Sequence, residues 1–378
     1  MDTGINSAAK ALARGGIALL VDDLSASPRA FLVCTAATTT PEMVSVLVNE
    51  ARGVICAAMS EERVRELGLP MMAARGNADG FDFAVSVESR HGVTTGISSA
   101  DRAKTLQTIA VTSDAKREVV TPGHIFPLVA RKGGVLVRSG IAEAAVDLLK
   151  LAEATPVAAL CQCIDERGAL VDMQGITRLQ QAQGFPVVTV AAIIRHRLAT
   201  ERLVERIASA QLPTQIAGEF SALCFLSHID QAEHLVLVKG TISPDDLEPV
   251  LVRVQAEDRL GDLLGGDQAL GLERIRQALR AIERRGRGVF VYIRHPRRAV
   301  LEQQIKRLQL GTTSDTAGDD AVDSHTRAAE LHEFGIGAQI LKSLGVRKLV
   351  LLSNSARALK GLDAFGLELV NREPLGPA

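Results

Sequence analysis

Three strings in the first half of the chain decide the expected fold: GVTTGISSADR at Gly92–Arg102, PGHIFPL at Pro122–Leu128 and GGVLVRSGIAE at Gly133–Glu143. They follow one another closely and carry polar side chains of catalytic type, such as His124 and Arg138. Around them, runs of β-branched residues alternate with stretches of helical periodicity, which is typical of α/β and α+β proteins. The sequence therefore predicts an α+β fold.

The pattern also places the individual elements. Strands are expected at Gly16–Val21, Gly53–Ala57, Phe81–Val87, Gly134–Val137, Glu219–Leu226, His234–Lys239, Val250–Val254, Val289–Ile293 and Lys348–Leu352. Helices are expected at Thr40–Ala51, Ala142–Ala152, Ala191–Ser209 and Leu272–Arg285. The composition shift after the third of these helices predicts two domains, residues 1–207 and 208–378.

Composition narrows the class of protein. The 378 residues are 47% hydrophobic and 23% charged with a net charge of −1, so no basic surface for nucleic acid or for a membrane is expected. No apolar run reaches the roughly 18–20 residues of a spanning helix, and the N-terminus lacks the layout of a secretory signal. Five scattered cysteines do not suggest a disulfide framework. A cytoplasmic location is expected.

The three opening strings resemble 3,4-dihydroxy-2-butanone-4-phosphate synthase. The second half has its own resemblance, to GTP cyclohydrolase II, through ASAQLPTQIAGEF at Ala208–Phe220, PVLVRVQAEDRLG at Pro249–Gly261, GRGVFVYIR at Gly286–Arg294 and LGVRKLVLLSN at Leu344–Asn354. The two families occur fused in this order in riboflavin synthesis, and together they cover about residues 10–375. The resemblance implies a synthase-type domain, normally a homodimer, followed by a mixed α/β domain.

The first family implies an Mg²⁺ site that this chain does not keep. Its acidic loop, D-D-E-D-R-E-N-E-G-D, corresponds to DDLSASPRAF from Asp22 to Phe31, and its metal-binding histidine corresponds to Ile141. Mg²⁺ requires hard oxygen ligands, which these substitutions remove. The altered positions are Ala26, Ser27, Arg29, Phe31, Ile141 and Gln162. The substitutions predict a collapsed or re-lined metal site, because leftover clustered carboxylates would repel one another.

Other positions of the first site persist. His124 stands where the family has a histidine important for catalysis, and Arg138 stands at the phosphate side, followed by Ser139 and Gly140. A guanidinium with loop amides can hold a phosphate. Glu143, Thr94, Thr95, Asp101 and Arg102 also remain. For Asp101, Arg102 and Glu143, structural ion pairs or caps are the favoured interpretation. For Arg138, a structural role and phosphate binding are equally favoured.

The second family implies a Zn²⁺ site with three cysteines spaced C-x10-C-x-C. Here those positions are Asp258, Ala269 and Gly271. The family's Q-E-G-R becomes His295–Arg298, which keeps Arg298 but loses the glutamate, and its later aspartate and arginine align with Glu330 and His332. Arg253 and Glu257 are retained. The loss of all three thiolates predicts that no zinc is held here.

Four further features have ordinary interpretations. Asp258, His295, His325 and His332 are permissible metal ligands, but solvated surface histidines are favoured. Cys161 and Cys163 are expected in the core. The tripeptide Gly335–Gly337 precedes an expected helix and is usually a turn rather than an anion site. The basic run at Arg294, Arg297 and Arg298 is typical of a solvated face.

Three functions remain open. The favoured one is a non-catalytic homologue, without a metal cofactor, that binds a phosphorylated small molecule or an active riboflavin-pathway enzyme and regulates or scaffolds it. The second is a repurposed enzyme acting on a phosphosugar or nucleotide-like substrate through His124, Arg138 or the second-half histidines. The third is an ordinary bifunctional enzyme with residual activity, which fold analogy supports and site chemistry opposes.

Overall fold

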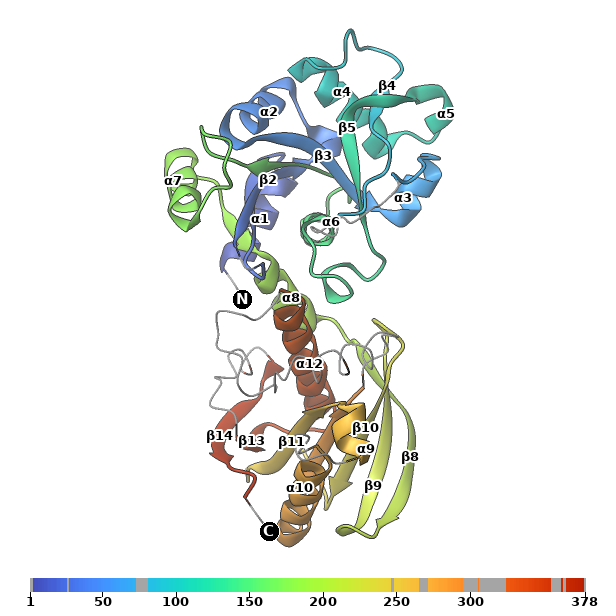
Figure 1. The fold of residues 1–378 in the computed structure, drawn as a ribbon, viewed down its shortest axis with the longest axis vertical. Helices are drawn as coiled ribbons and strands as arrows, with labels where there is room; N and C mark the ends of the chain where they lie inside the picture. The colour runs from blue at the N-terminus through green and yellow to red at the C-terminus, as the bar shows by residue number, and fades with distance from the viewer. Residues whose placement is uncertain are drawn as a thin grey trace. The chain divides into compact units, whose positions relative to one another are not determined.

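The computed structural model describes residues 3–25, 27–72, 81–245, 248–264, 271–294, 305, 324–354, 362 and 365–376 (Figure 1). The chain forms two compact units, one of residues Met1–His196 with Asp323–Ala328 and one of Arg197–Val322 with Ala329–Ala378. The division falls inside helix α8 (Val190–Thr200), and residues 207 and 208 both lie within strand β8 (Val204–Thr214). Because β8 pairs with β9 (Gly218–Ser227) along its length, residues 204–207 belong with the second sheet.

The first unit is built on a seven-stranded mixed sheet in the order β4-β5-β3-β6-β2-β1-β7. Its strands are β1 (Ala18–Asp22), β2 (Arg29–Thr35), β3 (Arg52–Ser60), β4 (Val87–Ser89), β5 (Val119–Ala130), β6 (Ala158–Cys163) and β7 (Val187–Thr189). Its helices are α1 (Thr3–Ala13), α2 (Pro41–Val46), α3 (Glu61–Glu66), α4 (Ser99–Val111), α5 (Ala115–Glu118), α6 (Ile141–Leu151) and α7 (Met173–Gln183), with short turns η1 (Ala36–Thr38), η2 (Leu47–Ala51) and η3 (Gly134–Leu136).

Alternation along the strands gives this sheet two different faces. Leu32 and Cys161 lie on one face and pack with α2 and α4 through side chains such as Leu106. Phe31 and Gln162, one residue along each strand, are register partners and lie on the opposite face. Helix α6 contacts β1, β3, β5 and β6. The altered positions at Phe31 and Gln162 therefore share one face of the sheet.

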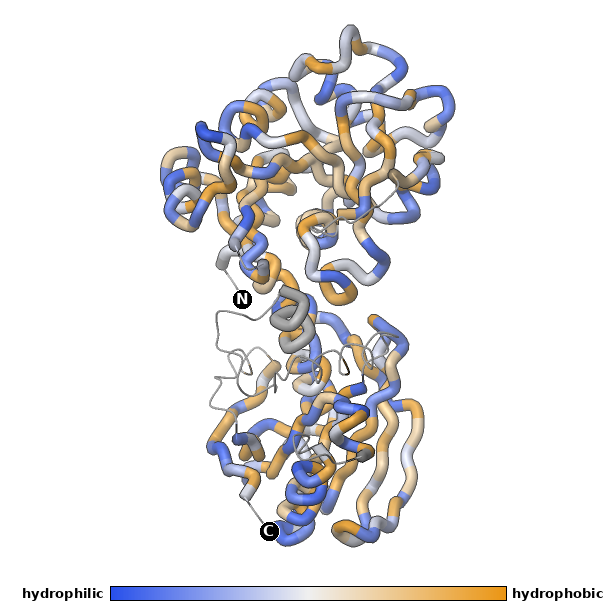
Figure 2. The backbone as a smooth tube through the Cα atoms, viewed as in Figure 1, coloured by the Kyte–Doolittle hydropathy of each residue, from blue (hydrophilic) through white to orange (hydrophobic). Residues whose placement is uncertain are grey.

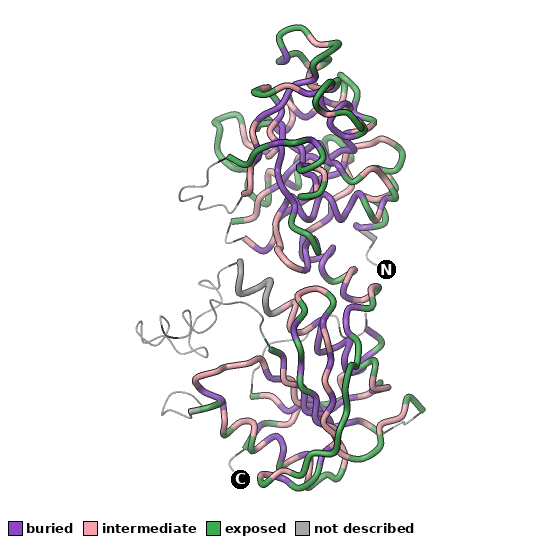
Figure 3. Tube along the Cα trace, turned by 90° about the vertical axis from the view of Figure 1, so that its right-hand side faces the viewer, coloured by how far each residue is buried: buried purple, intermediate pink, exposed green. Residues whose placement is uncertain are grey.

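The second unit has its own seven-stranded sheet in the order β14-β13-β11-β12-β10-β9-β8. Strands β11 (Val250–Ala256), β12 (Gly288–Ile293), β13 (Lys348–Leu352) and β14 (Glu368–Glu373) are parallel, whereas β8, β9 and β10 (Glu233–Lys239) are antiparallel. Its helices are α9 (Arg259–Leu264), α10 (Gly271–Arg285) and α12 (Ser324–Ser343). Figure 2 shows hydrophobic residues concentrated along the strands of both units. Figure 3 shows many of these strands buried, whereas β8 is exposed from residue 205 to residue 213.

The predicted fold class is confirmed, and three local expectations are corrected. The strand expected at Gly134–Val137 is the 3-10 turn η3, because Gly133 and Gly134 both have positive φ angles. The helix expected over Ala191–Ser209 ends at Thr200, and β8 follows. Within Phe81–Val87 only Val87 belongs to a strand. In the described part of the chain, no helix is long and apolar enough to cross a membrane.

Candidate functional site

A buried glutamate holds the retained histidine of the first unit. The Nδ1 atom of His124, on β5, lies 2.7 Å from Oε2 of Glu88, on the neighbouring strand β4. The Thr105 hydroxyl donates to the other carboxylate oxygen of Glu88 at 2.9 Å. Glu88 is only 8% exposed, whereas the His124 side chain is 43% exposed. Glu88 therefore fixes the imidazole ring through Nδ1 and leaves Nε2 as the nitrogen that can meet a ligand.

The loop before α4 is folded around a second carboxylate, Asp101. This carboxylate accepts from the Thr94 hydroxyl at 2.8 Å, from the Thr94 amide at 3.1 Å and from the Gly96 amide at 3.0 Å. The hydrogen bond from the Thr94 hydroxyl is the main cause that lowers the pKa of Asp101. Gly96 has φ +84, and a Cβ there would collide with Glu88 Oε2. The loop is thus held tightly against the Glu88–His124 pair.

Arg138 is engaged by the protein itself. Its Nε donates to Glu143 Oε1 at 2.6 Å, its Nη1 to Asp82 Oδ2 at 2.5 Å and its Nη2 to the Val129 carbonyl at 2.7 Å. Glu143 is fully buried and also accepts from the Arg131 amide at 2.8 Å. Burial raises the pKa of Glu143 although Arg138 opposes the shift. These contacts favour the structural interpretation of Arg138 and Glu143.

The residues after Arg138 shape the start of α6 without adding a charged group. Gly140 is the N-cap of α6, and a Cβ at this position would collide with Glu143 Oε2. Ser139 lies between Arg138 and this cap. The Gly140 amide, one of the loop amides expected to hold a phosphate, donates to the Arg138 carbonyl at 2.8 Å instead.

The substituted Mg²⁺ positions do not fit a hard cation. Phe31 is 3% exposed and Ile141 is 1% exposed, so apolar side chains fill both positions. Arg29, at the position of a family glutamate, pairs with Asp22 at 2.8 Å across the β1–β2 register. Ser27 lies exposed in the connecting loop, next to residue 26, which is outside the described residues. Of the two family metal ligands, the glutamate is thus replaced by the hydroxyl of Ser27 and the histidine by the hydrocarbon of Ile141, so the carboxylate oxygen that Mg²⁺ prefers is absent from these positions.

In the second unit, Asp258 and Gly271 stand at two of the family's three zinc positions, and both lie against the protein's own polar groups. Asp258 accepts from the Gly261 amide at 3.2 Å. The neighbouring Asp262 is buried and accepts from the Tyr292 hydroxyl at 2.6 Å and from Gln255 Nε2 at 2.9 Å. Gly271 lies at the start of α10, where a Cβ would collide with Asp262 Oδ1. No thiolate is present at these positions, so the donor set does not fit zinc.

The retained residues of the second unit lie close to this network. Arg253 donates to the Leu352 carbonyl at 3.0 Å and to Gln255 Oε1 at 3.3 Å. Burial, reinforced by Arg274, lowers the pKa of Arg253 to about 10. Glu257 lies 3.7 Å from the Arg294 guanidinium. Arg253 is therefore a buried cation whose guanidinium donates hydrogen bonds inside a polar cluster. Such a guanidinium can stabilise the fold and can also bind a ligand.

The alternative metal set in the second unit is not brought together in what the structure describes. His332, on α12, lies 3.7 Å from Asp230 in the β9–β10 turn. His295, Arg297, Arg298 and Ala269 lie outside the described residues, as do the side chains of His325 and Glu330. Across the described ranges, no group of three or more histidine, cysteine or acidic side chains is placed to hold a metal ion.

Two minor sequence interpretations are settled by burial and packing. Cys161 and Cys163 are core residues, and burial raises the pKa of both thiols to about 12. The Gly335–Gly337 segment is not a loop before a helix but lies inside α12. There, a Cβ on Gly335 would collide with Leu198, and one on Gly337 would press on Val254. These glycines permit close helix packing.

Sequence reasoning missed four polar residues that organise the two sites: Glu88, Asp82, Asp262 and Tyr292. Glu88 is the one charged residue in the apolar run from Phe83 to Ser89, and a lone acid in such a run is a usable signal for a buried hydrogen-bonded carboxylate. Tyr292 is the only tyrosine of the chain and likewise lies in an apolar strand.

Comparison with known proteins agrees with both halves of the fold. Residues 6–196 match the family model of 3,4-dihydroxy-2-butanone 4-phosphate synthase, and residues 205–374 match that of GTP cyclohydrolase II. The chain is 36% identical to the riboflavin biosynthesis protein RibBA of Chlorobium phaeovibrioides, over 98% of this chain and 90% of that one. It is 37% identical to a protein of Arabidopsis thaliana named monofunctional riboflavin biosynthesis protein RIBA 2, over 98% of this chain and 76% of that one.

A solved structure covers the same length. The crystal structure of RibBX, described as a two-domain 3,4-dihydroxy-2-butanone 4-phosphate synthase from A. baumannii, is similar with a TM-score of 0.73 and 29% identity, over 98% of each chain. The similarity to this structure therefore extends over both sheets and over both regions that match the family models. The chain belongs to the family of bifunctional riboflavin biosynthesis proteins, in which a 3,4-dihydroxy-2-butanone 4-phosphate synthase region precedes a GTP cyclohydrolase II region.

Proposed function

We propose that this member of the family carries out neither family reaction and acts as a non-catalytic, ligand-binding protein. The observation that carries the proposal is the state of the first site. Buried Phe31 and Ile141 stand where metal-associated polar groups are expected, and Arg29 neutralises Asp22. A cationic guanidinium beside the loop opposes the entry of a second cation. The polar contacts of Asp258 and Asp262 support the same interpretation in the second unit.

The binding role has two parts. The first is the binding of a phosphorylated small molecule beside the half-exposed His124. Arg138 is not the binding group, because its donors already contact Glu143 and Asp82. The other is a protein partner, either a second copy of this chain or an active enzyme of riboflavin synthesis. Two relatives of this architecture, RIBA 2 of Arabidopsis thaliana and RibBX of A. baumannii, are named for a single activity. The two-domain arrangement therefore does not by itself imply two reactions.

The test is an assay for formate, the product that both family reactions share. The full chain is given ribulose 5-phosphate with Mg²⁺ in one tube and GTP with Zn²⁺ or Mg²⁺ in another, beside an active RibBA protein as the positive control. We expect no formate above the no-protein blank. Turnover at 1 s⁻¹ or faster, which is on the order of ordinary enzymes, would refute the proposal for that half of the chain.

Metal analysis and light scattering complete the test. We expect the purified protein to contain less than about 0.1 equivalent of zinc, because tight structural binding needs thiolate or imidazole ligands. Size-exclusion chromatography with light scattering measures whether the chain is a dimer alone and whether its mass increases when an active RibBA protein is added. A monomer that forms no complex would overturn the partner part of the proposal and leave the formate result intact.

A repurposed enzyme is the second candidate, and the Glu88–His124 pair is the observation that favours it. A histidine oriented by a buried carboxylate and open at Nε2 is the arrangement of a general base. Such a base can exchange a carbon-bound proton next to a carbonyl without a metal. Incubating ribulose 5-phosphate in D₂O with chelator and following its C–H signals by proton NMR tests this. Exchange that is lost in both His124→Gln and Glu88→Gln would establish it, whereas no exchange by the unaltered chain would exclude it for this substrate.

A further inference from the structure

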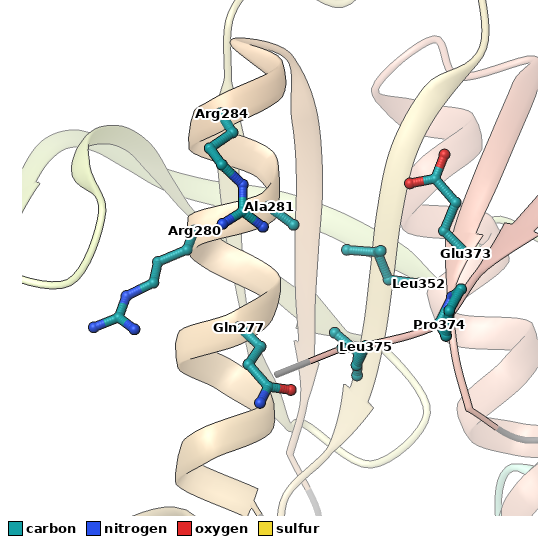
Figure 4. Close-up of a pocket in the computed structure, with 9 residues that line it drawn as sticks. Gln277, Arg280, Ala281, Arg284, Leu352, Glu373, Pro374 and Leu375 are labelled. Carbon is teal, nitrogen blue, oxygen red and sulfur yellow. The ribbon is translucent and has the colours of Figure 1, made fainter. Parts of the chain in front are cut away.

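A small pocket lies in the second unit, and none of the residues that line it is one of the family site positions described above. It has a volume of about 120 Å³, is partly open to solvent, and is bounded by α10, the end of β13 and the segment that follows β14 (Figure 4). Gln277, Ala281 and Arg284 line one side, and Leu352, Glu373 and Leu375 line the other. One water takes up roughly 30 Å³ in the liquid. The pocket itself therefore holds a group of a few heavy atoms.

The walls of this pocket are fixed before any ligand arrives. Asn354 clamps the chain after β14, since its Nδ2 donates to the Leu375 carbonyl at 3.1 Å and its Oδ1 accepts from the Leu375 amide at 2.6 Å. The Ser353 amide also donates to the Glu373 carbonyl at 2.9 Å. Binding then orders little further chain, which reduces its entropic cost.

The pocket has an excess of positive charge. The acid in its wall, Glu373, is already paired with Arg285 at 2.8 Å. Arg284 belongs to the lining, and within the described residues it makes no hydrogen bond or ion pair. Figure 4 shows Arg284 folded over Ala281, whereas Arg280 extends away from the opposite wall. A guanidinium in a pocket offers paired donors that match the oxygens of a phosphoryl or carboxylate group.

The position in the sheet is also one where ligands bind. Strands β11, β13 and β14 are parallel, and the pocket lies at the carboxyl ends of β13 and β14. In open α/β sheets, ligands collect at the carboxyl ends of parallel strands. The Leu352 carbonyl, at the end of β13, accepts from Arg253 Nη1 at 3.0 Å. The pocket wall is therefore connected by one hydrogen bond to a retained family residue.

We propose that this pocket binds the oxyanion group of a small metabolite, with Arg284 as the charged contact and Gln277 as a neutral one. Ala281, Leu352 and Leu375 form the apolar floor against which the carbon part of the ligand packs. The proposal does not depend on the loss of either family reaction, because its residues belong to neither family site. A phosphoryl and a carboxylate group share the chemistry that Arg284 recognises.

The test uses inorganic phosphate as the probe and the full chain as the receptor. The linewidth of the ³¹P NMR signal of phosphate is followed as protein is added, at constant ionic strength. We expect saturable broadening that Arg284→Gln weakens by about tenfold or more. Arg276→Gln removes the same charge from the same helix outside the pocket and should leave the broadening unchanged. No saturable broadening, or equal loss in both variants, would overturn the proposal.

Competition identifies the source of the oxyanion. Glycerol phosphate is added as a phosphoryl ligand and malonate as a carboxylate ligand, and the one that restores the narrow signal at the lower concentration names the class. Displacement by neither would contradict the assignment to a small metabolite. The fluorescence of Tyr292, the only tyrosine of the chain and a residue of β12 in the same unit, verifies that each variant is folded.

Discussion

Arg138 gives the sharpest test of the first site, because a structural role and a phosphate-binding role predict different outcomes for one substitution. Arg138→Met removes the hydrogen bonds to Glu143, Asp82 and the Val129 carbonyl while keeping most of the side-chain volume. Glu143 is fully buried and would keep only the Arg131 amide as a donor. Removing one partner of a buried ion pair costs about 3–5 kcal/mol. We expect a loss of this size in the free energy of unfolding of the first unit.

The pH dependence of that loss has a definite sign. Burial raises the pKa of Glu143 above that of a free glutamate, and Arg138 opposes the shift. Without Arg138 the pKa rises further. A carboxyl group whose folded pKa is raised destabilises the fold as pH rises through the window between the unfolded and folded values, because the folded state then holds the extra proton. The cost of Arg138→Met should therefore be larger at pH 8 than at pH 5.

The chain offers a clean way to assign the loss to one unit. It has no tryptophan and one tyrosine, Tyr292, which lies in the second unit. Urea unfolding followed by circular dichroism reports both units, whereas tyrosine fluorescence reports the second unit alone. We expect Arg138→Met to shift only the unfolding transition of the first unit, which circular dichroism reports and tyrosine fluorescence does not. Arg131→Met is the matched control, since Arg131 is 52% exposed and its contact with Asp82 is worth about 1 kcal/mol or less.

A small effect of Arg138→Met would refute this reasoning. If the variant loses less than about 1 kcal/mol, as an exposed pair would, Arg138 is not part of the framework and is available to a phosphate. A large loss that is equal at pH 5 and pH 8 would also contradict the role given to Glu143. Arg138→Met combined with Glu143→Gln should recover part of the loss at pH 8, because no buried charge is then left unpaired.

Three further predictions concern other parts of the chain. Gly96→Ala should destabilise the first unit by about 1–3 kcal/mol in urea unfolding, because its φ is +84 and the added Cβ collides with Glu88. Burial, with Asp262 as hydrogen-bond partner, raises the pKa of Tyr292 well above its usual range. Absorbance at 295 nm should therefore show no tyrosinate below pH 11 in the folded chain, and tyrosinate appearing near pH 10 would contradict this. Although burial raises the pKa of Asp230, its hydrogen bonds lower it from 3.8 to about 2. Asp230→Asn should cost about 2 kcal/mol at pH 6 and progressively less as pH falls from 4 to 2.

Much of the fold is visible in the sequence because local patterns and global packing agree. The strand expected at Lys348–Leu352 has the bounds of β13, and the helix expected at Leu272–Arg285 begins one residue early, at Gly271. The exceptions have local causes. Two adjacent glycines with positive φ turn Gly134–Val137 into a 3-10 segment, although its composition favours a strand. The helix over Ala191–Ser209 stops early because β8 gains a full partner in β9.

The site was less predictable than the fold because its contacts join residues far apart in sequence. Glu88 and His124 are 36 residues apart and meet only because β4 pairs with β5, with a register shift between Val87 and Glu88. Arg138 and Asp82 are 56 residues apart. Sequence could show which polar residues persist, but not which carboxylate each one meets. That distinction decides whether an arginine is a framework group or a ligand group.

The polar groups left at the two altered sites bear on whether these sites are re-lined or merely damaged. A site that loses its metal leaves charged side chains without partners, at a cost of several kcal/mol for each buried charge. Here Asp22 has Arg29 and the Ser25 hydroxyl, and Asp262 has Tyr292 and Gln255. Each of these carboxylates has donors from the protein itself. Random damage would not supply such donors at both sites, so the partners favour a protein whose stability no longer depends on either metal. The change Arg29→Glu tests this argument, because it places a second acid beside Asp22 and should destabilise the first unit equally in EDTA and in Mg²⁺, whereas rescue by Mg²⁺ would show that the site still binds the metal.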